Sequence, residues 1–142
     1  MQADNTPVLV EGIPVLQGTV DNFNGILIDA KSLPSDAVAF EKSLEVSLKY
    51  WHEEKRRGIW ISIPLQNSHF VPIAVKHKFI FHSAEPTHVT LNLWLPENEP
   101  NLLPSNASHT IGAGGFVLND KNELLVIAEK YNSVARAWKL PG

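Results

Sequence analysis

The sequence contains no cysteine and only one methionine among its 142 residues. Without cysteine there is no disulfide, no thiolate nucleophile and no cysteine-ligated metal, and this absence fits a reducing compartment. The first thirty residues also hold no lysine or arginine, so neither the basic start of a signal peptide nor an arginine-rich transit peptide is visible. We therefore expect a cytoplasmic protein, and a mitochondrial or nuclear location stays open.

Positive charge and long apolar runs are scarce as well. The chain has 12 Lys and Arg residues against 15 Asp and Glu residues, which gives a formal charge of -3. Proteins that bind nucleic acid usually carry clustered Lys and Arg, so we expect no nucleic-acid partner. No apolar run approaches the ~20 residues that a membrane helix needs, so we expect no membrane partner. The hydrophobic content of 44% suffices for one ordinary core.

The periodicity of residues 25–95 predicts an α+β layer in which helices pack on a mixed sheet. A helix is expected from Ser35 or Asp36, either of which is a good N-cap, to about Arg57, with Gly58 as its stop. Alternating apolar residues predict strands at 59–63 and 89–95, and shorter apolar runs predict strands at 25–29 and 79–81. A second helix is expected in between, capped by Asn67 or Ser68.

The flanks of this layer carry weaker signals. Residues 1–24 are expected to be an N-terminal arm, with one edge strand as the alternative, and the proline-rich residues 96–107 a linker. The basic triplet at 55–57 complements the dipole of the preceding helix, and phosphate binding is the alternative for these side chains.

The last segment, residues 108–142, predicts a β-hairpin. A glycine-rich strand at 111–118 and a turn at 119–122 lead to a second strand at 123–129, and a polar connection follows. An isolated hairpin is marginally stable in water, so this one needs a covering strand or helix from elsewhere.

Several short stretches resemble one protein family in the order in which they occur. The hairpin followed by Trp138, Lys139, Leu140, Pro141 and Gly142 resembles the opening of a Nudix hydrolase domain. Four upstream stretches are similar to the pre-Nudix region that precedes the catalytic domain in one branch of that family, namely residues 58–64, 70–74, 81–85 and 107–109. The resemblance implies a GNAT-like pre-Nudix domain at 25–95. It also implies that residues 108–142 are the N-terminal fragment, with the first strands, of a Nudix α/β/α sandwich.

The resemblance also implies an activity. Nudix hydrolases cleave nucleoside diphosphates linked to another moiety, here of the ADP-ribose or NADH type, and glutamates of the Nudix box hold Mg²⁺ or Mn²⁺. That box begins with Gly, five residues and Glu, and continues through Arg-Glu and Glu-Glu. None of its acidic residues is present, so we expect a chain cut just before the box, inactive alone, with no catalytic or metal-binding residue and no cofactor of its own.

Three residues are the candidates for contact with the substrate. The resemblance places Trp138 and Lys139 beside the site, with Lys139 meeting a phosphate, whereas from the residues themselves we favour core packing for Trp138 and Leu140. Gly114 would let another backbone or a nucleotide approach the strand closely. The rival function is a noncatalytic binding or regulatory module that forms a homodimer through the pre-Nudix sheet.

Two other patterns contain residue types that bind phosphate or zinc. The glycines at 112–115 lead into a strand rather than a helix, which excludes a dinucleotide fingerprint, and His109 replaces the anchor of an acetyl-CoA loop. His82, Glu85 and His88 are residue types that bind zinc, but Pro86 interrupts the segment, so we favour a hydrogen-bonded turn.

Overall fold

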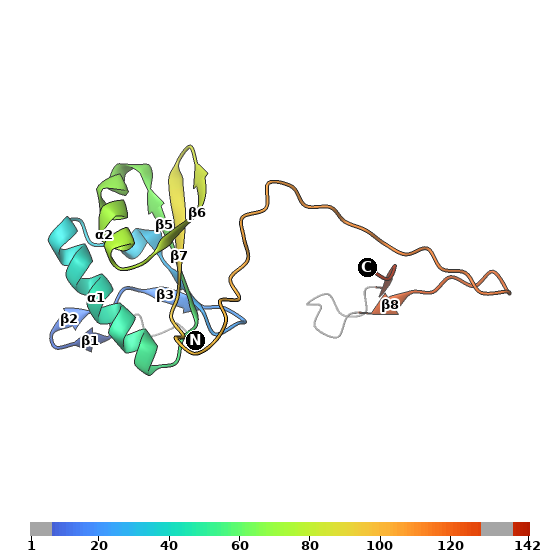
Figure 1. The fold of residues 1–142 in the computed structure, drawn as a ribbon, viewed down its shortest axis with the longest axis horizontal. Helices are drawn as coiled ribbons and strands as arrows, with labels where there is room; N and C mark the ends of the chain where they lie inside the picture. The colour runs from blue at the N-terminus through green and yellow to red at the C-terminus, as the bar shows by residue number, and fades with distance from the viewer. Residues whose placement is uncertain (1–6, 129–137) are drawn as a thin grey trace. The chain divides into compact units, whose positions relative to one another are not determined.

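The computed structural model describes residues 7–128 and 138–142. It divides the chain into two compact units, Met1–Asn106 and Ala107–Gly142, which are described here one at a time (Figure 1). The end of the strand predicted at 123–129 and the polar connection after it lie outside the described residues.

The first unit is built on a five-stranded mixed sheet in the order β3-β4-β5-β7-β6. Its strands are β3 (Gly18–Val20), β4 (Ile26–Ile28), β5 (Gly58–Pro64), β6 (Ile80–Glu85) and β7 (His88–Trp94). Strands β4 and β5 run parallel, and the other three pairs are antiparallel. The predicted α+β class with a mixed sheet is therefore confirmed. A small hairpin of β1 (Leu9–Val10) and β2 (Ile13–Pro14) precedes the sheet.

Helix α1 (Ala37–Glu53) provides the crossover that two parallel neighbouring strands require. As predicted, Asp36 caps it, and its side chain accepts a hydrogen bond of 2.9 Å from the Ala39 amide. The predicted end near Arg57 is wrong. Lys55 adopts a left-handed φ of 55°, and the amides of Lys55 and Arg56 bond back to the carbonyls of His52 and Trp51, which closes the helix. Gly58 begins β5 instead of stopping the helix.

The helices pack against one face of the sheet, and the core lies between them. Figure 1 shows α1 and α2 on the same side of the strands. The predicted alternation holds in β5, where Ile59, Ile61 and Ile63 are buried. The rings of Phe40 on α1 and Phe70 stack with their centroids 4.4 Å apart. The core also includes residues from the stretch expected to be an arm, namely Val15 and Leu16.

The second helical segment differs from its prediction at its start. A 3-10 helix, η2 (Leu65–Phe70), runs directly into α2 (Val71–Lys76), so neither Asn67 nor Ser68 caps it. A shorter 3-10 helix, η1 (Ala30–Ser32), follows β4. Across the surface, Lys76 Nζ of α2 donates to Glu41 Oε1 of α1 at 2.5 Å. This hydrogen bond lowers the pKa of Glu41 and raises the pKa of Lys76.

The second unit contains far less regular structure. Strand β8 (Ile127–Ala128) pairs antiparallel with β9 (Trp138–Lys139), and Leu118 forms a single bridge with Leu124. The predicted turn at 119–122 is present, with Asn122 donating its amide to the carbonyl of Asn119 at 3.0 Å. The stretch 111–118 does not form the long strand predicted for it, because its backbone makes one ladder bridge, at Leu118, and isolated hydrogen bonds at Gly115 and Val117. In the part of the chain that the structure describes, no helix has the length and apolar character needed to cross a membrane.

Candidate functional site

The two C-terminal candidates occupy the short strand β9. Trp138 lies opposite Ala128 in the ladder, and Lys139 lies opposite Ile127. The indole of Trp138 is exposed, with 68% of its surface accessible, so the expected core packing does not hold within this structure. Lys139 Nζ donates a 2.8 Å hydrogen bond to the carbonyl oxygen of Gly142.

The third candidate, Gly114, lies against the residues that follow β9. A Cβ atom added to Gly114 would meet Leu140 Cβ at 3.7 Å, which is ordinary contact. The amide of its neighbour Gly115 donates to the Pro141 carbonyl at 2.6 Å. A Cβ on Gly142 would lie 3.0 Å from the Gly114 Cα. Gly142 is thus the glycine whose missing Cβ admits another backbone, since an added Cβ would lie 2.2 Å from the Ala113 carbonyl oxygen, whereas Gly114 has room for one. The role expected for Gly114 stays a prediction.

These contacts bring Gly114 and Lys139 to the same residue, Gly142, but they do not build a metal site. The Glu123 carboxylate accepts from Asn119 Nδ2 at 2.6 Å and belongs to the turn. Among residues 7–128 and 138–142, no three His, Asp or Glu side chains come together in a way that could hold a metal ion. Divalent magnesium prefers several oxygen ligands. The described residues do not fit the ion that the family resemblance implies, and no hydrolytic step can be assigned to them.

The residue set His82, Glu85 and His88 is spread along the β6–β7 hairpin. Glu85 lies opposite His88 beside the turn, and His88 Nδ1 is 3.0 Å from Thr87 Oγ1. The ladder shifts register between Phe81 and Ser83, so His82 sits at a bulge. Its Nδ1 is 3.4 Å from Asn92 Nδ2, and its ring meets the Trp60 ring edge-on at 4.8 Å. Each histidine thus has a local partner.

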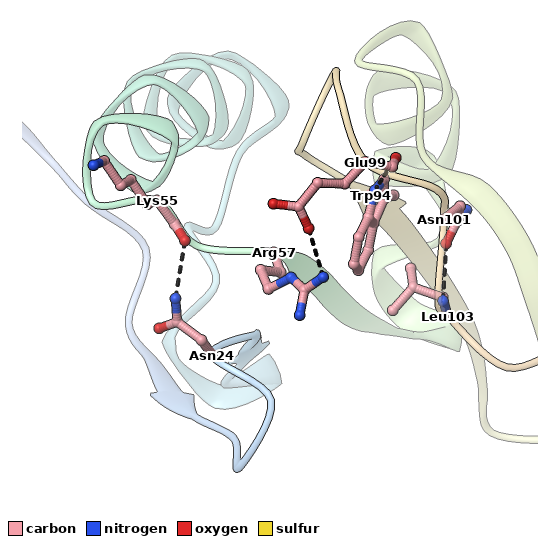
Figure 2. A network of polar contacts seen from close by, with 7 residues as sticks. All are labelled: Asn24, Lys55, Arg57, Trp94, Glu99, Asn101 and Leu103. Carbon is pink, nitrogen blue, oxygen red and sulfur yellow. Dashed lines mark hydrogen bonds and ion pairs between the residues drawn. The ribbon is translucent and has the colours of Figure 1, made fainter.

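The basic end of α1 is held by neighbouring protein groups. Arg57 Nη2 donates to Glu99 Oε2 at 2.6 Å, and its guanidinium carbon lies 4.9 Å from the centre of the Trp94 ring. Asn24 Nδ2 donates to the Lys55 carbonyl at 2.9 Å (Figure 2). These contacts join the end of α1 to the β3–β4 turn and to Glu99, a structural role that leaves fewer N–H groups of the Arg57 guanidinium for a phosphate.

Residues 101–106 continue from this network and pass over the sheet face that lacks helices. The face carries Trp60 and Asn92, which lie opposite each other in the ladder, whereas their neighbours Ile59 and Leu91 point to the core. Leu103 rests directly on Gly58, where an added Cβ would come within 2.5 Å of Leu103 Cδ2. Between residues 101–106 and β6 lies a hollow of about 370 Å³.

Sequence reasoning gave no role to Asn92 or Trp60. The alternation of β7 signalled that Asn92 faces away from the core, together with Thr90 and Trp94. It could not show that residues 101–106, expected to be a linker, would cover this face and bury Asn92 to 3% exposure.

Residues 16–95 match the model of the Nudix hydrolase domain, which covers more than half of the chain. The chain therefore belongs to the Nudix hydrolase family, and the resemblance drawn from the short stretches is confirmed. The matched residues lie within the first unit.

Curated relatives are similar along most of this chain. It is 46% identical over 123 residues to Nudix hydrolase 8 of Arabidopsis thaliana, an alignment that covers 85% of this chain and 33% of the relative. It is 37% identical over 142 residues to the human protein named nucleoside diphosphate-linked moiety X motif 6, covering 97% of this chain and 44% of the relative. The chain thus spans less than half the length of these relatives.

Proposed function

We propose that the complete protein hydrolyses a diphosphate that links a nucleoside to another moiety, of the ADP-ribose or NADH type, with Mg²⁺ or Mn²⁺. The observation that carries this proposal is the family match at residues 16–95 together with the similarity to longer Nudix hydrolases. The first unit is then a noncatalytic pre-Nudix domain of GNAT-like fold. Residues 108–142 are the first strands of the catalytic sandwich, where Trp138, Lys139 and Gly114 border the substrate.

The proposed reaction needs a divalent metal ion, so the chemistry of that ion and the location of its ligands can be tested separately. Divalent ions neutralise charge on the phosphate oxygens and lower the pKa of the attacking water, and this is the chemistry they would supply when bound. Since the described residues offer no such ligand set, we assign the carboxylates to a part of the complete protein outside these 142 residues. This chain contributes to the fold and to one border of the substrate site.

The experiment compares the 142-residue chain with a chain extended through the following coding sequence. We expect the extended chain to contain the box glutamates and to release AMP from ADP-ribose or NADH only with Mg²⁺ or Mn²⁺. The 142-residue chain should release no more AMP than a sample without protein. Metal-dependent turnover by the shorter chain would contradict the placement of the metal ligands outside it. An extended chain without activity would contradict the proposed hydrolase function.

A second candidate is a noncatalytic module that pairs with a second copy of itself. Strand β6 is an edge of the five-stranded sheet, and Ile80 and Phe81 on it are 57% and 64% exposed. An edge strand presents unpaired backbone groups to another strand, and apolar side chains there favour such pairing. Sedimentation should then show a dimer that Phe81→Lys converts to a monomer. A wild-type chain that sediments as a monomer would remove this candidate.

A further inference from the structure

The turn between β3 and β4 contains an asparagine followed directly by a glycine, Asn24 and Gly25. An asparagine loses its amide when the main-chain nitrogen of the next residue attacks the side-chain carbonyl carbon, and a following glycine hinders that attack least. The bond from Gly25 N to Asn24 Cγ closes a succinimide ring, the bond from Cγ to Nδ2 breaks, and Nδ2 leaves as ammonia with the proton from Gly25. Water then opens the ring to aspartate or isoaspartate, so the reaction needs no oxidant or reductant.

The fold favours this pair of residues at these two positions. Asn24 has a left-handed φ of 62°, a conformation that asparagine adopts more readily than most residues. A Cβ on Gly25 would come within 2.6 Å of the Gly58 carbonyl oxygen and of Asp21 Oδ2. No larger residue fits at position 25 without a shift of the backbone, so the turn requires the glycine that makes its asparagine reactive.

In the folded turn, hydrogen bonds occupy both of the groups that would react. The attacking nitrogen, Gly25 N, donates to Asp21 Oδ1 at 2.7 Å. The side-chain amide of Asn24 donates through Nδ2 to the Lys55 carbonyl at 2.9 Å (Figure 2). The other end of the same amide, Oδ1, accepts from Arg56 Nη1 at 2.6 Å. The nitrogen can therefore reach the side chain only after a local opening of the turn breaks these bonds.

We propose that Asn24 is a deamidation site whose rate is set by opening of the β3–β4 turn, and whose isoaspartyl product releases this turn from the end of α1. In isoaspartate the main chain runs through the former side chain, and the carbonyl of Asn24 becomes a free carboxylate. That carbonyl accepts the Arg57 amide at 3.0 Å, and the departing Nδ2 is the group that holds the Lys55 carbonyl. One modification thus changes both links, and it does so whether or not the complete protein is a hydrolase.

Ageing of the 142-residue chain beside a synthetic peptide of residues 19–29 tests the proposal, with isoaspartate at Asn24 measured by peptide mass spectrometry. The folded chain should react about tenfold more slowly than the peptide, because opening breaks a hydrogen bond to a charged acceptor. Asp21→Ala removes that acceptor and should raise the rate in the folded chain about tenfold. Asp29→Ala is the matched control, since Asp29 makes the same kind of bond, to Lys31 N, outside this turn. Its rate should equal that of the wild type.

Amide hydrogen exchange separates a freed nitrogen from misfolding of Asp21→Ala. Exchange should quicken at Gly25 and stay slow at Ile61 in the core. Asp21→Asn, which keeps a neutral acceptor, is the second variant, and its rate should lie between those of Asp21→Ala and the wild type.

The isoaspartyl product is tested in the aged wild-type chain, where exchange should quicken at Arg57, whose acceptor has changed. Equal rates for the folded chain and the peptide would overturn control by turn opening. So would a folded Asp21 variant that reacts no faster than the wild type. Unchanged exchange at Arg57 after conversion of Asn24 would overturn the release from α1.

Discussion

Both units contain Phe, Leu and Ile side chains, but the two units bury these side chains to very different extents. In the first unit Phe40, Leu44 and Ile61 are fully buried, and every buried core residue lies between Val15 and Leu91. In the second, Phe116 is 70% exposed and Ile111 is 89% exposed, and none of the described residues of 107–142 is buried. The difference teaches that apolar content makes a core only where long strand pairing and a covering helix bring two apolar faces together.

The largest expected difference between the units comes from removing one aromatic ring from each. Phe40→Ala should lower the free energy of unfolding by about 3–5 kcal/mol, because it empties a fully buried position and removes the stack on Phe70. Phe116→Ala should change it by no more than about 0.5 kcal/mol. Urea unfolding of both variants measures the contrast, and equal losses would mean that the second unit has a core of its own.

A smaller contrast comes from adding a methyl group at one glycine in each unit. Gly58→Ala should cost about 1–2 kcal/mol, because the new Cβ would overlap Leu103 Cδ2 and push residues 101–106 away from the sheet. Gly112→Ala, where nothing lies within 4 Å, should be close to neutral. Urea unfolding gives the energies, and faster amide exchange at 101–106 in Gly58→Ala alone would locate the change. Unaltered exchange there would contradict the contact.

Replacing a residue with left-handed backbone by glycine should stabilise the protein instead of destabilising it, and each unit contains such a residue. Lys55→Gly should stabilise the first unit by about 1 kcal/mol, since glycine adopts the φ of 55° without steric cost. Asn122→Gly, at a φ of 58° in the turn of the second unit, should leave the main unfolding transition where it is. The transition midpoints in urea measure both. A destabilised Lys55→Gly would show that the lysine side chain matters more than its backbone.

The smallest expected effect concerns the surface pair of Glu41 and Lys76. Because the hydrogen bond from Lys76 lowers the pKa of Glu41 below its ordinary value of 4.5, the stabilisation is present above pH 4.5 and is lost as the pH falls through the lowered pKa. The pKa of Lys76 is raised above 10.5, so the same contribution is lost at strongly alkaline pH. Glu41→Gln should flatten the acid limb of the stability curve slightly, because both side chains remain partly exposed to solvent. An unchanged acid limb would show no net contribution.

Local signals predicted the first unit well and failed where contacts are distant in sequence. The Asp36 cap, the alternation of β5 and the turn after Glu85 all depend on neighbouring residues, and the structure has each of them. The burial of Leu16 depends on α1, where its amide bonds to Ser47 Oγ, a partner 31 residues along the chain, so the composition of residues 1–24 did not reveal it. The pairing of β3 with β4 is local, and β3 is an edge strand, which was the alternative expected for this stretch.

The hairpin predicted in the second unit is formed only around its turn, where Leu118 pairs with Leu124. Apolar residues in 111–118 favour a strand, but strand propensity needs a pleated, half-buried surface to act on, and the described residues of the second unit supply none. The candidates Trp138 and Lys139 came from family resemblance and Gly114 from the lack of a side chain in glycine, and their role as substrate contacts stays a prediction. Asn92 could not be found, because its burial results from a segment that pairs with no strand.

The hydrogen bond of 2.8 Å from the Leu16 amide to Ser47 Oγ, buried against α1, sets a limit on how far this protein can be shortened. A recombinant version that starts at residue 25, where the periodic pattern begins, would lack Val15, Leu16 and the edge strand β3. Helix α1 would then lose the cover over Ser47, whose hydroxyl keeps only its bond to the Ser43 carbonyl, and would expose an apolar strip to solvent. Expression trials should keep the first unit intact from its amino-terminal hairpin onward.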